Sequence, residues 1–363
     1  MPARFLCPGC SADMEFDPAS GLMKCPYCGQ TRTVDTAKPD VETRHALEDY
    51  SGAEAAQRLG QMSEKALEVS CSGCGSQVIF EPPEVAGVCA FCGAKIVAQP
   101  KAADPMIAPD GVLPASVPRE TASRSVKDWL GSRWFAPNDL QKLSRQESIQ
   151  GVYLPYWMFD AESVTPYRGE RGEYYYVAER YQTQDAQGRT VMQTRQVRHT
   201  RWYPASGQVQ RSFDDLLVTA TRAIPTDRMR ALEPWDLQEL KAYEPAFLSG
   251  FKAQRYQLPL AEGFEQSKQI MADVIQGEIR RDIGGDEQRI HQMDPRFFDV
   301  AFRHLLLPVW IGAYRFQGKV YQVVVNGRTG EVQGERPYST VKIVLFVLAM
   351  LVVFAFLALL QKQ

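Results

Sequence analysis

The eight cysteines of this 363-residue chain are the residues whose type and spacing most clearly indicate a chemistry. They form four Cys-x-x-Cys pairs with none left over: Cys7/Cys10, Cys25/Cys28, Cys71/Cys74 and Cys89/Cys92. The last two pairs repeat the first two at an offset of 64 residues, with 14 residues between the inner cysteines of each set. Four further residues recur at that offset, Gly9, Phe16, Pro18 and Gly29 as Gly73, Phe80, Pro82 and Gly93. The chain therefore contains a tandem duplication of a four-cysteine unit.

This spacing is typical of a zinc ribbon. Two residues between cysteines allow one tight turn to present both thiolates to one ion, and two such turns close a tetrahedral site of four sulfurs. A site without an open position is structural, and a unit this small lacks the core to fold without its metal. We predict two zinc ions per chain, one bound by Cys7, Cys10, Cys25 and Cys28 and one by Cys71, Cys74, Cys89 and Cys92. Iron in the same cage is the chemical alternative.

Two other uses of these cysteines compete with zinc. The segment Cys25-Pro26-Tyr27-Cys28 matches the redox motif of glutaredoxins, but that chemistry requires the first cysteine at a helix N-terminus, whereas here a partner pair lies upstream. A disulfide framework is the second alternative. The first residues, MPARFLCPGC, lack the apolar stretch of a signal peptide, which favours a reducing compartment.

The rest of the chain offers no recognisable catalytic constellation. The patterns G-x-x-x-x-G-K-[ST], H-E-x-x-H and G-x-S-x-G are all absent. The four histidines are scattered, and we interpret each as a surface or core residue: His45, His199, His291 and His304. The acidic clusters are interpreted as loop caps and solvated helix ends: Asp214/Asp215 and Asp282/Asp286/Glu287. We predict that the protein is not an enzyme and has no small-molecule substrate.

The last apolar stretch predicts a membrane span. Residues 343–360 read IVLFVLAMLVVFAFLALL, 18 apolar residues without a charge, a glycine or a proline. A helix of this length covers about 27 Å, close to the thickness of the hydrocarbon core of a bilayer. A buried core helix is the alternative, although such helices usually show a polar stripe. We expect a single C-terminal span that anchors a body facing the cytoplasm.

Together these signals predict an α+β, multidomain fold class, with two small four-cysteine zinc ribbons, a β-rich α+β domain and one C-terminal transmembrane helix. The expected order is ribbon 1 (1–35), a helical connector (36–68), ribbon 2 (69–98), a Pro-rich linker (99–118), the β-rich domain (119–340) and the tail anchor (341–363). All six tryptophans follow residue 119, which places the main hydrophobic core in the β-rich domain.

Within that domain, alternating polarity predicts strands over 151–219 and a β-meander over 305–339, with turns at Gln317-Gly318 and Asn326-Gly327. Residues 261–283 are expected to form a helix that stops at Gly284-Gly285. Its apolar face would consist of Phe264, Met271, Val274, Ile275 and Ile279. A fainter repeat links Leu154-Pro155-Tyr156-Trp157 to Leu307-Pro308-Val309-Trp310, and two related sheet units would explain it.

A basic and aromatic stretch spans residues 168–211, with eight arginines against four acids and interleaved tyrosine and tryptophan. An ordinary solvated sheet face, contact with an anionic membrane surface or a protein partner, and stacking on single-stranded nucleic acid all fit this composition. Overall charge argues against nucleic acid, since the net charge is −2 and residues 1–100 hold 8 Lys/Arg against 13 Asp/Glu. Two zinc sites of four thiolates would each add a formal charge of about −2 there.

Several phrases of the chain, together with the ribbons, resemble one bacterial family. These segments are YLPYWMFDAES, YRGERG, RWYPASGQVQRSFDDLLV, DIGGDEQRI and LLLPVWIGAYRFQGKVYQVVVNGRTGEVQGERPYS. They are similar to tail-anchored double-zinc-ribbon membrane proteins often labelled primosomal protein N-prime (replication factor Y)-like helicase. The resemblance implies zinc-ligand roles for the eight cysteines, no catalytic residue, and partners of the flotillin (Band 7) or phage-shock-protein-A type. The nucleotide motifs that the helicase label requires are absent.

The sequence therefore favours a non-enzymatic, membrane-anchored zinc-ribbon adaptor that recruits cytosolic scaffold proteins to the membrane. The alternative function is a membrane-tethered zinc-ribbon protein that binds nucleic acid. We expect no nucleic-acid partner for the preferred function, because the acidic ribbons would repel phosphate.

Overall fold

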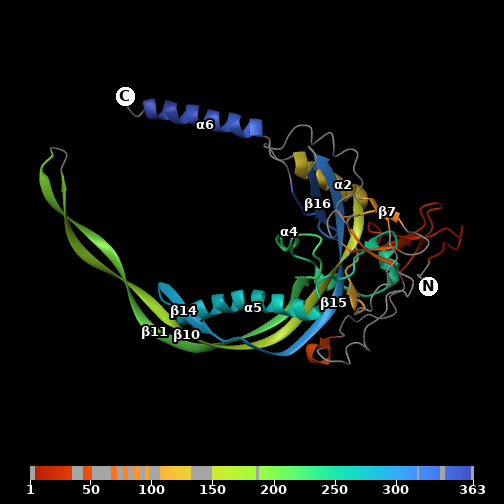
Figure 1. The fold of residues 1–363 in the computed structure, drawn as a ribbon, viewed down its shortest axis with the longest axis horizontal. Coiled ribbons are helices and arrows are strands. Elements are labelled where there is room, and N and C mark those ends of the chain that lie inside the picture. The colour runs from red at the N-terminus through yellow and green to blue at the C-terminus, as the bar shows by residue number, and fades with distance from the viewer. Residues whose placement is uncertain are drawn as a thin grey trace.

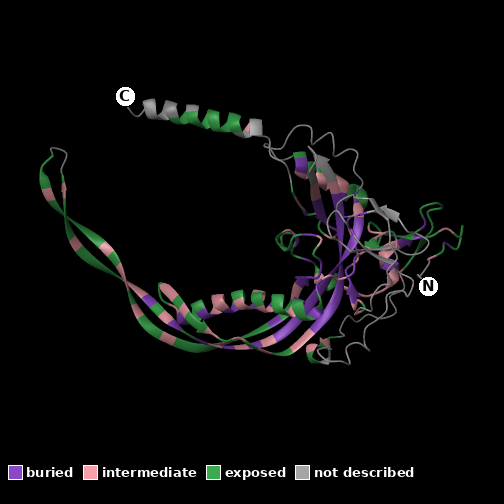
Figure 2. Ribbon diagram, in the orientation of Figure 1, coloured by how far each residue is buried: buried purple, intermediate pink, exposed green. Residues whose placement is uncertain are grey.

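A curved antiparallel sheet forms the centre of the molecule, and one end of it continues into a long two-stranded arm (Figure 1). The computed structural model describes residues 5–34, 44–50, 67–71, 77–80, 86–89, 91, 95–97, 107–131, 149–184, 188–316, 319–335 and 340–360. Strands hold 47% of the described residues and helices 25%. Burial is concentrated in the central sheet, whereas the arm is exposed on both strands (Figure 2).

The described elements have the following bounds. The ribbon strands are β1 (Glu15–Asp17), β2 (Leu22–Lys24), β3 (Thr31–Arg32), β5 (Leu67–Ser70), β6 (Gln77–Phe80), β7 (Ala86–Val88) and β8 (Lys95–Val97). The strands of the central sheet are β4 (His45–Ala46), β9 (Gly111–Val112), β10 (Gln150–Gln184), β11 (Thr190–Thr219), β12 (Lys241–Ala242), β13 (Lys252–Ala253), β14 (Glu287–Met293), β15 (Arg296–Phe316), β16 (Lys319–Asn326) and β17 (Val332–Gly334). The helices are α2 (Arg119–Gly131), α4 (Thr226–Arg230), α5 (Leu260–Ile283) and α6 (Thr340–Leu360), with 3-10 turns η1 (Leu47–Tyr50), η2 (Leu237–Glu239) and η3 (Pro245–Leu248).

The main path of the sheet is β11-β10-β15-β16-β17, and both faces of its centre are buried. Alternate residues of a strand point to opposite faces, so Leu154 and Leu307 join one apolar cluster while Tyr153 and Leu306 join another. This arrangement explains why both central strands read as nearly continuous apolar runs.

The two LPxW segments pair directly with each other in the middle of the sheet, with Leu154 opposite Leu307. Along β10, the outer neighbour is first the short parallel strand β13 and then the antiparallel strand β11. Along β15, the outer neighbour is first the short parallel strand β9 and then the antiparallel strand β16. Pro155 and Pro308 lie where the outer neighbour changes, which is where a strand can tolerate the missing N–H of proline.

Hydrogen bonds around the two segments are equivalent as well. The carbonyls of Pro155 and Pro308 each accept a backbone bond at 2.9 Å, from Ala220 and Gly327 respectively. The indole of Trp157 donates to Leu258 and that of Trp310 to Val117, both at 2.8 Å, immediately before the prolines that precede α5 and α2. These matches confirm two related sheet units, which an approximate two-fold axis relates.

The arm, defined as residues 173–201, is the part of the β10–β11 hairpin that no other strand accompanies among the described residues. β15 pairs with β10 as far as Val164, and β14 continues the pairing as far as Gly172. The twelve residues of β10 beyond that point span about 40 Å at the usual rise of a strand.

β-bulges on both sides of Asp160 mark the place where the sheet turns from the body toward the arm. The register of β10 with β11 shifts between Phe159 and Ala161, and its register with β15 shifts between Asp160 and Glu162, with the extra residue on β11 and on β15 respectively. The buried Asp160 carboxylate accepts the Asp215 N–H at 2.8 Å and lies 3.6 Å from the Arg303 guanidinium, which also pairs with Asp215 at 2.8 Å. A bulge adds twist and bends its strand, so this buried ion-pair network fixes the direction of the arm.

The predicted α+β fold class with a transmembrane helix is wrong. The structure is mostly β, because the alternating sequence from 150 to 219 forms two strands of 35 and 30 residues instead of several short ones. In the predicted helical connector, residues 45–50 form β4 and η1, and residues 51–66 lie outside the described part.

The prediction of a C-terminal membrane span is also wrong. The predictions of the membrane as a partner and of a membrane localisation depended on that span and are corrected with it. Of the residues that the structure describes, none forms a helix that is both long enough and apolar enough to cross a bilayer.

Candidate metal centre

Ribbon 1 is a three-stranded antiparallel sheet, β1-β2-β3, with one cysteine pair before it and one between β2 and β3. In the first turn the Cys7 N–H donates to Ala12 O and Ser11 N–H to Cys7 O, both at 2.8 Å. In the second turn Cys25 and Gly29 form the same two kinds of bond, at 2.9 and 3.0 Å. The two knuckles therefore share one backbone geometry, as the repeated spacing predicts.

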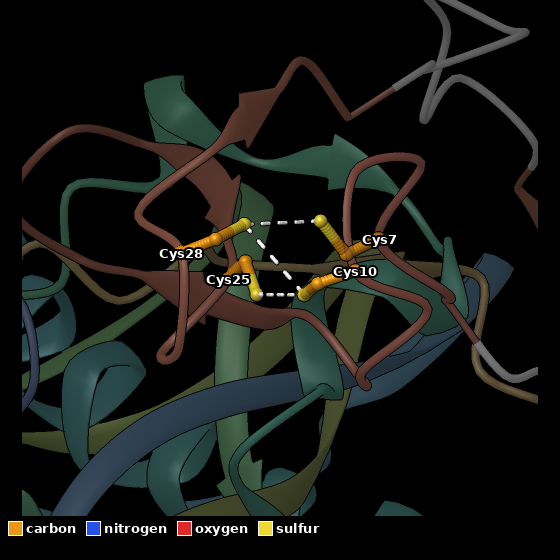
Figure 3. A group of neighbouring side chains, drawn as sticks. All are labelled: Cys7, Cys10, Cys25 and Cys28. Atoms are coloured by element: carbon orange, nitrogen blue, oxygen red, sulfur yellow. Dashed lines mark hydrogen bonds between the residues drawn. The ribbon is translucent and has the colours of Figure 1, made fainter.

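The four sulfurs of ribbon 1 point toward one another (Figure 3). All of their Sγ atoms lie within 4.8 Å of one another. The Sγ atoms of Cys7 and Cys28, and those of Cys10 and Cys25, are 3.4 Å apart, and those of Cys10 and Cys28 are 3.6 Å apart. With zinc–sulfur bonds of about 2.3 Å, the edge of a tetrahedron is about 3.8 Å. The cluster therefore fits one tetrahedral metal ion with little adjustment.

The electrostatics of the four thiols differ. Hydrogen bonds from the backbone, chiefly at Cys28, lower the pKa of Cys25 to about 6 against the opposing effect of burial. For Cys7, burial raises the pKa, but backbone hydrogen bonds outweigh it and the pKa is lowered. A backbone bond at Ala12 lowers the pKa of Cys10, but the neighbouring thiols and burial raise it to about 12. A bound dication would favour the thiolate form of all four and release the remaining protons.

Ribbon 1 is attached to the body through its apolar residues. Phe16 meets Phe247 of η3 edge to face at 5.4 Å, and the Ser249 hydroxyl donates to Met14 O at 2.7 Å. Cys7, Cys25 and these apolar residues belong to one buried cluster with Tyr153 and Leu306 of the central strands. The metal site therefore supports the packing on one face of the sheet.

Ribbon 2 contacts the opposite face. Cys71 and Cys89 are buried, at 2% and 1% exposure, in the cluster that contains Leu154 and Leu307. The Phe91 carbonyl accepts a hydrogen bond from the Gln322 side chain at 3.0 Å. Cys74 and Cys92, the remaining predicted ligands, lie outside the described residues, so the second predicted site is seen only as a pair of cysteines.

The other candidate residues serve structural contacts. Asp215 pairs with Arg303, as described above, and Asp282 accepts the Tyr167 hydroxyl at 2.5 Å. Asp286 accepts the Tyr174 N–H at 2.7 Å and Glu287 the Tyr174 hydroxyl at 2.8 Å. In these contacts Asp286 accepts a backbone N–H, as a loop cap does, whereas Asp215, Asp282 and Glu287 bind side chains.

The histidines are dispersed as predicted. His45 pairs with Asp110 through Nε2 at 2.7 Å, and His291 lies 3.3 Å from Glu170. His199 stacks on Tyr175 in the arm, and His304 is buried in the core. No pattern in the sequence indicates the Asp160–Arg303 network or the burial of His304, because both depend on tertiary neighbours.

The basic and aromatic stretch forms the arm and its root, and its arginines lie over tyrosine rings. Arg198 is 4.2 Å from the ring centre of Tyr174, Arg201 is 5.0 Å from that of Tyr175, and Arg195 is 5.4 Å from that of Tyr181. In each pair the arginine on β11 lies diagonally across from the tyrosine on β10, and the two side chains share a face of the hairpin. The pair of Arg198 and Tyr174 lies on the opposite face from the other two pairs. These contacts stabilise a two-stranded segment that has no core of its own.

Comparisons with known proteins give one relative of similar length. The chain is 25% identical over 354 residues to the uncharacterized protein YdjG of Bacillus subtilis (strain 168), which covers 93% of this chain and 91% of that protein. No family model matches the chain. No solved structure matches it either. The similarity therefore extends over nearly the whole chain, and it brings no assigned activity with it.

Proposed function

We propose that the protein is a non-enzymatic adaptor that depends on zinc for its fold and uses the arm to hold a protein partner. The resemblance to double-zinc-ribbon proteins makes scaffold proteins of the flotillin (Band 7) or phage-shock-protein-A type the first partners to test. Zinc at both ribbons is part of this proposal. Ribbon 1 supports it through the fit of its four sulfurs, and ribbon 2 through the repeated spacing of its cysteines.

The arm is the observation that supports the adaptor role most directly. It extends about 40 Å past the last strand that supports it, and exposed apolar and aromatic side chains lie along it. Tyr176 is 63% exposed and Met192 is 59% exposed. Exposed apolar side chains on an ordered, projecting element mark an interaction site rather than a core. The zinc-supported body would then hold the base of the arm in place.

Site-specific photo-crosslinking tests the adaptor function. A benzoylphenylalanine introduced at Tyr176 should yield a discrete protein adduct after irradiation of cells that express the full chain. The matched control position is Val274 on α5, which is 38% exposed and lies outside the arm. An adduct at Tyr176 that Val274 does not give supports the proposal. No protein adduct at any of several exposed arm positions contradicts it.

Nucleic-acid binding is the second candidate, since the arm contains both arginine and tyrosine side chains. The ring faces of Tyr174, Tyr175 and Tyr181 are already occupied by guanidinium groups, which reduces the surface left for stacking bases. We expect labelled single-stranded DNA to bind only in the range of non-specific contacts, about 10⁻⁴ to 10⁻⁶ M at physiological salt. Sub-micromolar binding by fluorescence anisotropy would favour the nucleic-acid function.

A further inference from the structure

The outer edge of β11 is the longest strand edge that is left without a paired strand among the described residues. β11 is the first strand of the sheet path, and no described strand pairs with its outer side. An edge strand of this kind presents a row of unpaired N–H and C=O groups, which is a template for one more strand. Natural proteins rarely leave 30 residues of strand edge unpaired without protection, and charged side chains are one common protection.

That charge has one sign. From Thr190 to Phe213 the strand contains four arginines and one histidine and no aspartate or glutamate: Arg195, Arg198, His199, Arg201 and Arg211. A second copy of the same edge would bring arginine against arginine, and like charges placed opposite each other destabilise a strand pair. The arginines therefore act against self-pairing and favour a partner strand of opposite charge.

The positions of the side chains fit such a strand. Residues of equal parity share a face, so Arg195, His199 and Arg201 lie on one side of the hairpin and Arg198 on the other. Arg198 and Arg201 rest on Tyr174 and Tyr175 of β10, which holds their charges in place along the hairpin. The β11 strand of the arm has three arginines. Arg195 lies 3.3 Å from the Glu179 carboxylate, and among the described residues no carboxylate lies within 4 Å of the other two.

From these observations we infer that β11 of the arm binds an extended acidic segment of a protein partner as an added strand. The inference rests on the proposed adaptor function and specifies the chemistry of its partner. Backbone hydrogen bonds would supply affinity, and acidic side chains at alternate positions would meet Arg195, His199 and Arg201. A nucleic acid fits the edge less well, because phosphates accept hydrogen bonds but cannot donate to the exposed carbonyls.

Peptide binding to the full chain tests this inference. The probe is a fluorescein-labelled decapeptide of alternating glutamate and valine, measured by anisotropy. Three competitors separate the sources of binding: the same peptide with alternate backbone nitrogens methylated, a lysine–valine decapeptide, and an oligothymidylate of equal charge. We expect the acidic peptide to bind at least about tenfold more tightly than each of them, because only it can both pair with the strand and neutralise the arginines.

The matching protein variants are Arg198→Glu combined with Arg201→Glu, and Arg296→Glu as control. The first pair reverses charge on the arm and leaves the ion pair of Arg195 with Glu179 in place. Residue 201 lies opposite Glu173, so the folding of the double variant is measured as well. Arg296 is 73% exposed on β15, outside the arm, and its reversal should leave binding unchanged. The double variant should lose at least about tenfold in affinity for the acidic peptide, while circular dichroism checks that it is folded.

Three results would overturn the inference. If methylation of the peptide backbone leaves binding unchanged, or if oligothymidylate binds as tightly as the peptide, the edge acts as a general cationic surface and adds no strand. Absence of peptide binding would overturn it as well. Protein adducts at Tyr176 in the crosslinking experiment would persist in that case, so failure of the acidic partner is distinguishable from failure of the adaptor function.

Discussion

At the scale of single residues, the two knuckles of ribbon 1 differ at one informative position. The residue after the second cysteine has a positive φ in both, 58° at Ser11 and 77° at Gly29. Glycine adopts this conformation without cost, whereas a residue with a Cβ is strained by about 1 kcal/mol. Gly29 therefore suits this position of the turn, and Ser11 carries the strain.

This difference predicts opposite effects for two substitutions. Gly29→Ala should destabilise the metal-loaded ribbon by about 1 kcal/mol, because its added Cβ has open space but an unfavourable φ. Ser11→Gly should stabilise it by up to about the same amount. Competition with a metal chelator measures both.

Gly277→Ala is the control for the knuckle substitutions. Gly277 lies inside α5 with open space around its Cβ position and without a positive φ, so alanine there should stabilise the protein by about 0.5–1 kcal/mol. Its effect should appear in thermal unfolding and not in chelator competition. Equal effects of Gly29→Ala and Ser11→Gly in one direction would contradict the argument from φ.

His304 is a buried histidine that its surroundings keep neutral. It is 3% exposed and lies between Trp157 and Tyr256, with ring centres 4.9 and 5.5 Å away. Its Nδ1 makes a hydrogen bond of 2.9 Å with Ile107 O, and within the described structure its Nε2 has no partner. Burial lowers the pKa of His304 to about 4, against an ordinary value of 6.5.

The lowered pKa predicts a loss of stability in mild acid. The unfolded chain takes up this proton near pH 6.5 and the folded chain only near pH 4, so the contribution of His304 is complete above about pH 6.5 and declines as the pH falls toward 4. The full effect is of the order of 3 kcal/mol. Chemical denaturation of the wild type and of His304→Phe, which keeps a ring and cannot titrate, should show a flatter pH dependence for the variant. Acid release of zinc affects both proteins and cancels in the difference. Parallel pH profiles would contradict the prediction.

At the scale of elements, the bulges beside Asp160 tie the direction of the arm to a buried ion pair. Asp160→Asn should destabilise the protein by about 2 kcal/mol, because it weakens a charged hydrogen bond to Asp215 and leaves the buried Arg303 with one carboxylate instead of two. Thermal unfolding measures the change. The control is Asp294→Asn, which breaks an exposed pair with Arg296 and should change stability by less than about 0.5 kcal/mol. Similar costs for the two substitutions would contradict a special role for the bulges.

The elements also show which parts of the fold could be predicted from the sequence. Alternating polarity predicted strands over 151–219, and the meander with its Asn326-Gly327 turn is confirmed by β15, β16 and β17. The lengths of β10 and β11 could not be predicted, because both strands run through residues that usually mark turns, such as Pro166, Gly169 and Gly207. Cross-strand pairs keep the hairpin extended through these positions.

The predicted helix over 261–283 is confirmed as α5, and Gly284 ends it with a positive φ of 66°. Its buried face was predicted in part. Val274 is 38% exposed, whereas Gly263 and Ser267 are buried. The reason is tertiary, since a Cβ at Gly263 would lie 2.6 Å from the Trp157 ring. Small residues were missed because apolar periodicity cannot show where another element needs close approach.

At the scale of the whole molecule, the ribbons lie on opposite faces of one sheet. Ribbon 1 packs near Tyr153 and Leu306, and Cys71 and Cys89 of ribbon 2 pack near Leu154 and Leu307. The cysteine pattern predicted the four-cysteine cluster of ribbon 1, which could hold a metal ion. The spacing within each ribbon contains no information about where the ribbon packs on the sheet. Loss of metal at one ribbon should therefore weaken the packing mainly on the face of the sheet that this ribbon covers.

The packing gives a prediction for zinc removal. Elemental analysis of the purified protein should find two zinc ions per chain, and Cys25→Ser should reduce this to one. Hydrogen exchange in Cys25→Ser should accelerate around Tyr153 and Leu306, because the apolar residues of ribbon 1 no longer cover them. Exchange in the arm should not change, and serves as the internal control. One metal ion in the wild type, or mostly iron, would contradict the prediction.

The approximate two-fold relation of the LPxW segments has a consequence for the origin of the chain. Each half supplies a short parallel strand to the long strand of the other half, β9 to β15 and β13 to β10, so neither half completes its own sheet. A self-complementary surface of this kind is what an ancestral homodimer would possess before gene duplication and fusion joined its two subunits. After fusion the hairpins of the two halves could diverge in length. The difference between the 35-residue β10 and the 21-residue β15 is consistent with such divergence.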